Sequence, residues 1–180
     1  TGHIDAIQGA MNFIKSSTEQ YVVMCDANVV SNFDMEAMIE SHIETGADVT
    51  VAYKRGKLPK NHRDIMSFGF DENSRVTEIL LSNKIEQDCD FSLDIVIIDR
   101  NMLIHLIEEA SSRNQTNMVR DIFQPNVKDL KIYGWEVKDF AAVMDSTESY
   151  VNVTEELLKN SAARKQLFTS ERPVLTKTRD

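Results

Sequence analysis

The hydrophobic and polar positions of this chain alternate between the spacing of helices and that of strands. Apolar residues recur at helical intervals over residues 3–15 and 34–45, and Gly46 is placed to end the second helix. Residues 21–25 form an apolar, β-branched run that is too short for a helix, and residues 49–53 alternate like a strand. The order strand, helix, strand predicts a crossover unit with parallel strands.

The rest of the chain adds a hairpin, a capped helix and several short strands. Further strands are predicted over residues 67–70, 75–81, 91–98, 130–137 and 141–144. Turn-forming residues join the first two into a hairpin, Asp99 is placed to cap the helix that follows, and Gly134 indicates a bulge. A short helix ends before Pro125, and Asp145 with Glu148 three residues later predicts the start of another helix.

Together these elements predict an α/β fold with a Rossmann-like, mixed but mostly parallel sheet that carries helices on both faces.

The composition is typical of a globular domain, with 42% hydrophobic and 27% charged residues. The formal net charge of −9 argues against nucleic-acid binding, and no apolar run is long enough to span a membrane. Cys25 and Cys89 are too few for a disulfide framework, so we expect reduced thiols and a cytoplasmic protein.

The first candidate functional residue is Asp26, which follows the strand at residues 21–25. We expect this strand to be buried on both faces, and ligands bind beyond the carboxyl ends of strands in open parallel sheets. Asp26 and Asn28 form an Asp-x-Asn pair that can hold a divalent metal on the phosphates of a nucleotide. A cap on the strand end or on the next turn explains Asp26 equally well. The metal hypothesis therefore depends on a second ligand elsewhere in the chain.

His42, on the inner side of its helix, is predicted to be a packed core histidine.

Several stretches carry a family resemblance, and they follow one another in the family's order. They are residues 2–6, 26–29, 34–42, 46–50, 92–96 and 147–150. On these stretches the chain resembles the sugar nucleotidyltransferase family, and within it ADP-glucose pyrophosphorylase (glucose-1-phosphate adenylyltransferase). Residues 172–177 are similar to the glycogen biosynthesis protein GlgD branch, a pyrophosphorylase-like subunit that pairs with the catalytic one.

The resemblance also implies a domain organisation. Residues 1–160 would form the central and C-terminal part of a nucleotide-diphospho-sugar transferase-like domain, truncated at its N-terminal side. Residues 161–180 would form a linker toward a left-handed β-helix domain beyond the chain. The chain opens at Thr1 without a methionine, which fits a piece of a longer protein. An open sheet edge at the truncated side would favour self-association.

The resemblance further implies which residues would form the site. In the family two aspartates hold Mg²⁺ on the nucleotide, and the positions that match them are Asp26 and Val143. A nucleotide-binding remnant would comprise Gly2, Asp5, Asp26 and Asn28. A sugar-phosphate remnant would comprise Ser92 and, after a small gap, Lys84, because the family's Glu-Lys-Pro motif falls on Leu81 and the two residues after it. The family's glycine in the strand at residues 91–98 is replaced by Asp94.

These departures predict a non-catalytic regulatory or scaffolding subunit of a bacterial glucose-1-phosphate adenylyltransferase, acting in glycogen biosynthesis. We expect the catalytic subunit as its partner, no intact catalytic residue, no cofactor in this part of the protein, and at most weak metal binding by Asp26. The alternative is an active adenylyltransferase that makes ADP-glucose and pyrophosphate with Mg²⁺, through Asp26, Asp145 and Lys84. A third reading is a metal-dependent glycosyltransferase that uses Asp26 and Asn28.

Overall fold

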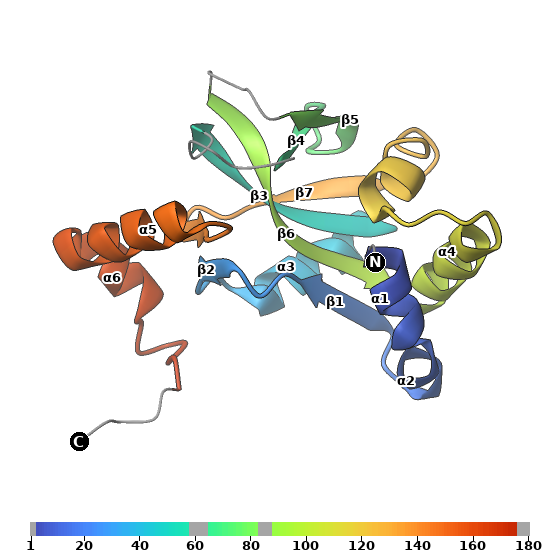
Figure 1. Ribbon diagram of the computed structural model, residues 1–180, viewed down its shortest axis with the longest axis horizontal. Coiled ribbons are helices and arrows are strands. Elements are labelled where there is room, and N and C mark those ends of the chain that lie inside the picture. Colours follow the sequence, from blue (N-terminus) through green and yellow to red (C-terminus); the bar gives the residue numbers. More distant parts are fainter. Residues whose placement is uncertain (1–2, 58–64, 83–87, 176–180) are drawn as a thin grey trace.

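The computed structural model describes residues 3–57, 65–82 and 88–175, and a six-stranded mixed sheet forms its centre (Figure 1). The strands of this sheet run in the order β5-β4-β6-β3-β7, with β1 paired to β6. Their bounds are β1 Tyr21–Cys25, β3 Val49–Lys57, β4 Ile65–Phe70, β5 Val76–Ser82, β6 Asp88–Asp99 and β7 Ile132–Glu136. A separate two-stranded sheet is formed by β2 Val29–Ser31 and β8 Ala141–Val143.

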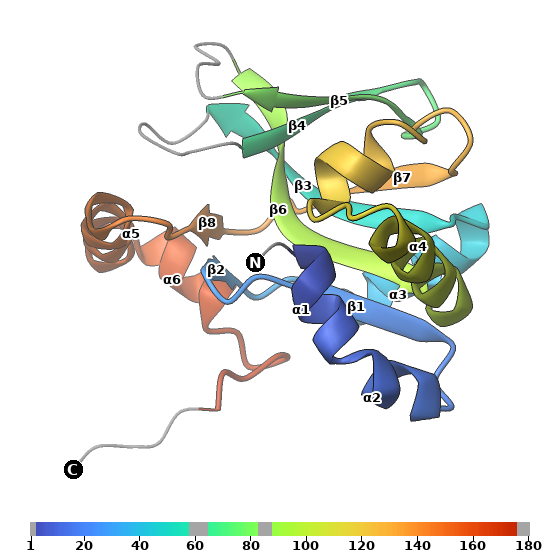
Figure 2. The same ribbon diagram turned by 45° about the vertical axis from the view of Figure 1, so that its right-hand side comes forward.

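Helices cover both faces of the main sheet, as expected from the sequence. The helices are α1 His3–Gly9, α2 Met11–Ser16, α3 Met35–Thr45, α4 Arg100–Ser112, the π-helical turn η1 Val119–Phe123, α5 Thr147–Lys159 and α6 Ser161–Leu167. Figure 2 shows α1, α2 and α4 on one side of β6, whereas α3 lies on the other side and α5 and α6 project away from the sheet. None of the helices in the described part of the chain is long and apolar enough to cross a membrane.

The centre of the fold is β6, which is buried on both faces. Its successive residues Ile97 and Ile98 are both 0% exposed, and they belong to two different apolar clusters on opposite faces of the sheet. Successive side chains of a strand point to opposite faces, so one strand supplies both cores. The apolar run at residues 91–98 was predicted as a strand, and the structure extends it at both ends.

The α/β class and the mixed sheet are confirmed, but the pairing is more antiparallel than predicted. Among the described strands of the main sheet, β3 and β7 are the parallel pair. Both β1 and β3 are antiparallel to β6, which lies between them, so the predicted crossover joins parallel strands that are not neighbours. The burial expected for β1 was wrong: Val23 is 40% exposed, because β6 is the one strand that pairs with β1 among the described residues.

Local signals placed several helix ends correctly. The side chain of Asp34 accepts a hydrogen bond from the amide of Ala37 at the start of α3, and Gly46 ends that helix in the left-handed conformation. Asp99 caps α4 through the amides of Asn101 and Met102. Before α5, however, the cap is Ser146 rather than Asp145, and Ser149 completes its capping box, because the Ser146 side chain sits three residues before that amide.

Three other features differ from the sequence-based expectation. The first predicted helix breaks into α1 and α2 at Ala10, and the short elements β2 and α6 were missed. Gly134 does not form a bulge, since β7 keeps a regular register with β3 through it. A Cβ atom at Gly134 would lie 2.4 Å from Cε1 of Phe70 and 2.8 Å from Cε1 of Tyr53. The glycine is needed for the close approach of these two rings.

Candidate functional site

A cavity of about 430 Å³ opens at the carboxyl end of β1. Its polar groups come from His3 on α1, Asp26 after β1, and Asp94 on β6. The rest of its lining is mostly apolar and includes Val23, Met66 and Phe123. A mostly apolar cavity with a few convergent polar groups is a typical ligand site, so this cavity is the candidate functional site.

Asp94 is held in an unusual backbone conformation beside Asp26. Its φ of 52° lies in the left-handed region, which few residues other than glycine, asparagine and aspartate adopt. The Asp94 amide donates to the hydroxyl oxygen of Ser92 over 2.9 Å, and that hydroxyl donates to Oδ1 of Asp94 over 3.3 Å. The amide of Asp26 donates to the carbonyl oxygen of Asp94 over 3.3 Å. These bonds stabilise the irregular stretch of β6 at Asp94, and both aspartates line the cavity.

The surroundings of Asp94 change the pKa of its carboxyl group. Burial raises the pKa of the Asp94 carboxyl above its ordinary range, and the negative charge of Asp26 adds to this shift. The hydrogen bond from Ser92 and the positive charge of His3 act in the opposite direction. The cavity therefore favours a protonated Asp94 more than water does.

The residues predicted from the sequence are only partly brought together here. Gly2 and Lys84 lie outside the described residues. Asp5 lies exposed on α1, and Ser92 is buried with its hydroxyl bonded to Asp94. Asn28 does not line the cavity with Asp26, and its Oδ1 is buried without a hydrogen-bond partner in the described part of the chain.

Val143 lies close in space to the residues that follow Asp26, but its side chain is buried in an apolar core. It pairs with Val29 across the β2–β8 sheet, and the amide of Met144 donates to the carbonyl oxygen of Asn28 over 2.8 Å. Val143 is 8% exposed and packs in the cluster that also contains Leu93. The position that the resemblance matches to the second metal-binding aspartate thus lies near the residues that follow Asp26.

Comparison with known proteins places these features in context. The chain matches no family model. It is 24% identical to the glycogen biosynthesis protein GlgD of Bacillus subtilis (strain 168) over 170 residues, which cover 94% of this chain. It is 37% identical to the glucose-1-phosphate adenylyltransferase of Rhodococcus erythropolis over 83 residues, and 35% identical to that of Cutibacterium acnes over 82 residues, each match covering 44% of this chain. These matches support a likeness to the ADP-glucose pyrophosphorylase family.

The chain spans only part of the length of these relatives. The match covers 39% of the GlgD relative, 20% of the Rhodococcus enzyme and 19% of the Cutibacterium enzyme. The activity, substrates and partners of a whole protein therefore enter as proposals.

The residues present do not fit the two-aspartate magnesium site that the resemblance implies. Val143 supplies no oxygen, and Oδ1 of Asp145 accepts a hydrogen bond from Ser149 over 3.3 Å at the start of α5. In the ranges that the structure describes, no three or more His, Cys, Asp or Glu side chains are grouped to hold a metal ion. Mg²⁺ prefers several oxygen ligands in near-ideal octahedral geometry.

The sequence did not predict that Asp94 and His3 line one cavity together with Asp26. Asp94 was noted as a charged residue in place of a family glycine, and this replacement was the signal that it lies at a special backbone position. His3 reaches the cavity from the first turn of α1. Its approach depends on how α1 packs on the sheet, for which the sequence gives no local signal.

Proposed function

We propose that this chain belongs to a non-catalytic regulatory or scaffolding subunit of a bacterial glucose-1-phosphate adenylyltransferase, acting in glycogen biosynthesis. One observation carries the proposal. The position that matches the second metal-binding aspartate of the family holds Val143, whose side chain is buried in an apolar cluster beside the Asp26 turn.

The chemistry of nucleotidyl transfer explains why this replacement matters. A sugar phosphate attacks the α-phosphate of ATP, and a divalent metal neutralises the negative charge on the phosphates. Loss of one such electrostatic contact typically costs about 3 kcal/mol of transition-state stabilisation. Asp26 and Asp94 face the same cavity, and neither side chain supplies a positive charge that would attract a phosphate group.

The proposed role is exerted through association with the catalytic subunit. Similarity to GlgD over nearly the whole chain, together with similarity to adenylyltransferases over a shorter part, supports a place beside that enzyme. A subunit without its own chemistry acts by shifting the conformational equilibrium of its partner.

The alternative is an active adenylyltransferase, and the higher identity to the adenylyltransferases is the observation that favours it. A direct assay separates the two. The chain, in the longest natural form that contains it, is supplied with ATP, glucose 1-phosphate and Mg²⁺, and pyrophosphate release is measured for wild type and Asp26→Asn. We expect no release above that of a heat-inactivated sample in either protein.

Pyrophosphate release with matching ADP-glucose formation, abolished by Asp26→Asn, would establish the alternative. The regulatory role is tested by co-expression with a catalytic adenylyltransferase from the same cell. We expect the two to co-purify, and the rate or substrate affinity of the catalytic subunit to change on binding. Two proteins that stay separate at micromolar concentrations would contradict the proposal.

A further inference from the structure

The chain that follows α6 lies on the domain with its large apolar side chains exposed. None of residues 168–175, called here the closing segment, is buried. Phe168 is 58% exposed, Val174 45% and Leu175 93%. Hydrophobic burial therefore contributes little to its position, and polar contacts must hold it.

The main polar contact is a reciprocal pair between Asn32 and Arg172. The amide nitrogen Nδ2 of Asn32 donates to the carbonyl oxygen of Arg172 over 2.7 Å. The guanidinium of Arg172 donates back to the carbonyl oxygen of Asn32, over 3.0 Å from Nη2 and 3.3 Å from Nε. The same Asn32 amide also donates to the carbonyl oxygen of Leu167, at the end of α6, over 2.7 Å. We call this arrangement the Asn32–Arg172 clasp.

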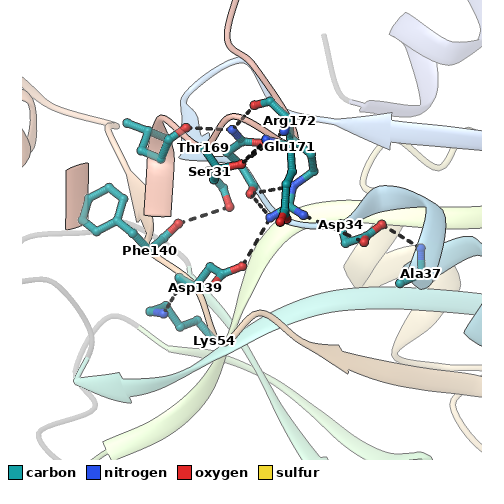
Figure 3. A network of polar contacts seen from close by, with 11 residues as sticks. Ser31, Asp34, Ala37, Lys54, Asp139, Phe140, Thr169, Glu171 and Arg172 are labelled. Atoms are coloured by element: carbon teal, nitrogen blue, oxygen red, sulfur yellow. Dashed lines mark hydrogen bonds and ion pairs between the residues drawn. The ribbon is translucent and has the colours of Figure 1, made fainter. Parts of the chain in front are cut away.

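The guanidinium of Arg172 also lies among carboxylates from two other parts of the chain (Figure 3). It approaches Asp34 to 3.9 Å and Asp139 to 3.6 Å. Asp34 is the residue that caps α3. The carbonyl oxygen of Asp139 accepts a hydrogen bond from Nζ of Lys54, on β3, over 2.7 Å. One arginine thus connects the closing segment to α3, to the loop between β7 and β8, and through that loop to the main sheet.

The clasp is also connected to the Asp26 cavity through β2. Asn32 directly follows β2, which pairs along its length with β8. At the other end of β2, the carbonyl oxygen of Asn28 accepts the amide of Met144. The strand β2 is therefore a hydrogen-bonded connection between Asn32 and the residues that follow Asp26.

We propose that the Asn32–Arg172 clasp is a conformational switch that couples docking of the closing segment to β2 and to the Asp26 cavity. The closing segment is held mainly by the polar contacts of Asn32 and Arg172 and buries none of its large apolar side chains, so docking and release differ by a small free energy. A partner that binds the closing segment elsewhere opens the clasp and loosens β2. This inference does not depend on whether the protein has its own catalytic activity.

Hydrogen–deuterium exchange of the full chain tests the coupling. Arg172→Ala removes the guanidinium, and Arg172→Lys keeps the charge but loses the planar fork. Arg164→Ala is the matched control, because Arg164 donates to the carbonyl oxygens of Leu157 and Leu158 in the α5–α6 junction. We expect Arg172→Ala to speed exchange about tenfold in both residues 29–38 and residues 168–174, as loss of charge-assisted hydrogen bonds predicts.

Exchange in β5 should stay unchanged in every variant, and Arg172→Lys should give a smaller increase in the same two regions. The rate of alkylation of Cys25, which lines the Asp26 cavity, provides a second readout and should rise in Arg172→Ala relative to Cys89. Faster exchange confined to residues 168–174, with Cys25 unchanged, would overturn the coupling. No change in either region would show that the clasp does not hold the closing segment. If Arg172→Ala fails to fold, Arg172→Lys decides by the same criteria.

Discussion

The backbone amide of Asp26 donates a hydrogen bond to the carbonyl oxygen of Asp94, and this 3.3 Å contact joins the end of β1 to a left-handed residue of β6. Two carboxylates therefore face one cavity. The strain and the charge at Asp94 both lead to a measurable effect on stability.

Replacing Asp94 by asparagine should stabilise the chain at neutral pH by about 1 kcal/mol, because the amide carries no charge and tolerates positive φ. The pKa of the folded Asp94 is raised above its ordinary value of 3.8. Wild-type stability therefore falls as pH rises from that value through the raised folded pKa, and is level above it. Urea unfolding at several pH values checks this.

The advantage of Asp94→Asn should accordingly shrink toward pH 3. Asp129→Asn makes the same chemical change at an exposed position and serves as the control. An Asp94→Asn variant less stable than wild type at pH 7 would mean that the carboxylate makes a favourable contact there.

An aspartate at position 143 should destabilise the fold by about 3 kcal/mol or more, because the Val143 side chain is in an apolar core. Val143→Ala, which only shortens the side chain, should cost about 1 to 2 kcal/mol. Thermal unfolding of both variants, with and without millimolar Mg²⁺, measures the difference. A Mg²⁺-dependent rise in the melting temperature of Val143→Asp, absent in Val143→Ala, would contradict the buried placement and indicate a restorable metal site.

His42 and Thr50 form a buried pair that should make the fold sensitive to mild acid. Nδ1 of His42 lies 2.8 Å from Oγ1 of Thr50, and His42 is 2% exposed. Burial lowers the pKa of His42 below its ordinary value of 6.5. The folded state therefore favours the neutral ring, and stability is lost as pH falls below about 6.5 toward the lowered pKa.

The variant His42→Gln should flatten this part of the stability curve, whereas His105→Gln, on an exposed side chain, should not. Thr50→Val should cost about 1 to 2 kcal/mol at pH 7, since it leaves the ring nitrogen without its partner. An unchanged slope between pH 5 and 7 in His42→Gln would exclude His42 as the titrating group.

The two thiols should differ in reactivity. Cys25 is exposed, whereas burial raises the pKa of the partly buried Cys89 thiol, and the charges of Asp90 and Asp88 add to that shift. Because the thiolate is the reactive form, iodoacetamide should alkylate Cys25 first at pH 7.5. Mass spectrometry of wild type, Cys25→Ser and Cys89→Ser follows each site, and faster modification of Cys89 would show that its surroundings are more open than described.

A methyl group at position 134 should be poorly tolerated. Gly134→Ala places Cβ against the rings of Phe70 and Tyr53, so we expect a loss of about 2 kcal/mol. Gly9→Ala is the control, because a Cβ at Gly9 has no atom within 4 Å. Adding Phe70→Leu should recover part of the loss if the clash is its cause, and no recovery would point to a backbone effect instead.

The sequence predicted features that depend on neighbouring residues and missed features that depend on contacts between distant parts of the chain. The stop Gly46 and the cap Asp99 were found because each acts within a few residues of its own position. The burial of β1 was mispredicted because it depends on how many strands flank it, which no local pattern encodes. Gly134 was misread for the same reason, since its neighbours come from β3 and β4.

The residues of the candidate site also differ in whether local signals or long-range contacts determine their place. Asp26 was proposed because of its place at a strand end, and Val143 because of the resemblance that includes residues 147–150. Asp94 became a neighbour of Asp26 only through the long pairing of β1 with β6 and through its positive φ. An aspartate does not by itself predict such a conformation, and the signal was the family glycine that it replaces.

The position of β6 also determines when the protein can fold during its synthesis. β1 and β3 leave the ribosome well before β6, yet both pair with β6, and the register joins Tyr21 to Asp99. Until that strand emerges, the first two strands of the main sheet have no β6 edge to pair with, and their apolar residues stay uncovered. Nascent chains that end before residue 88 should therefore depend on chaperones, and the chain should compact soon after residue 99 is released.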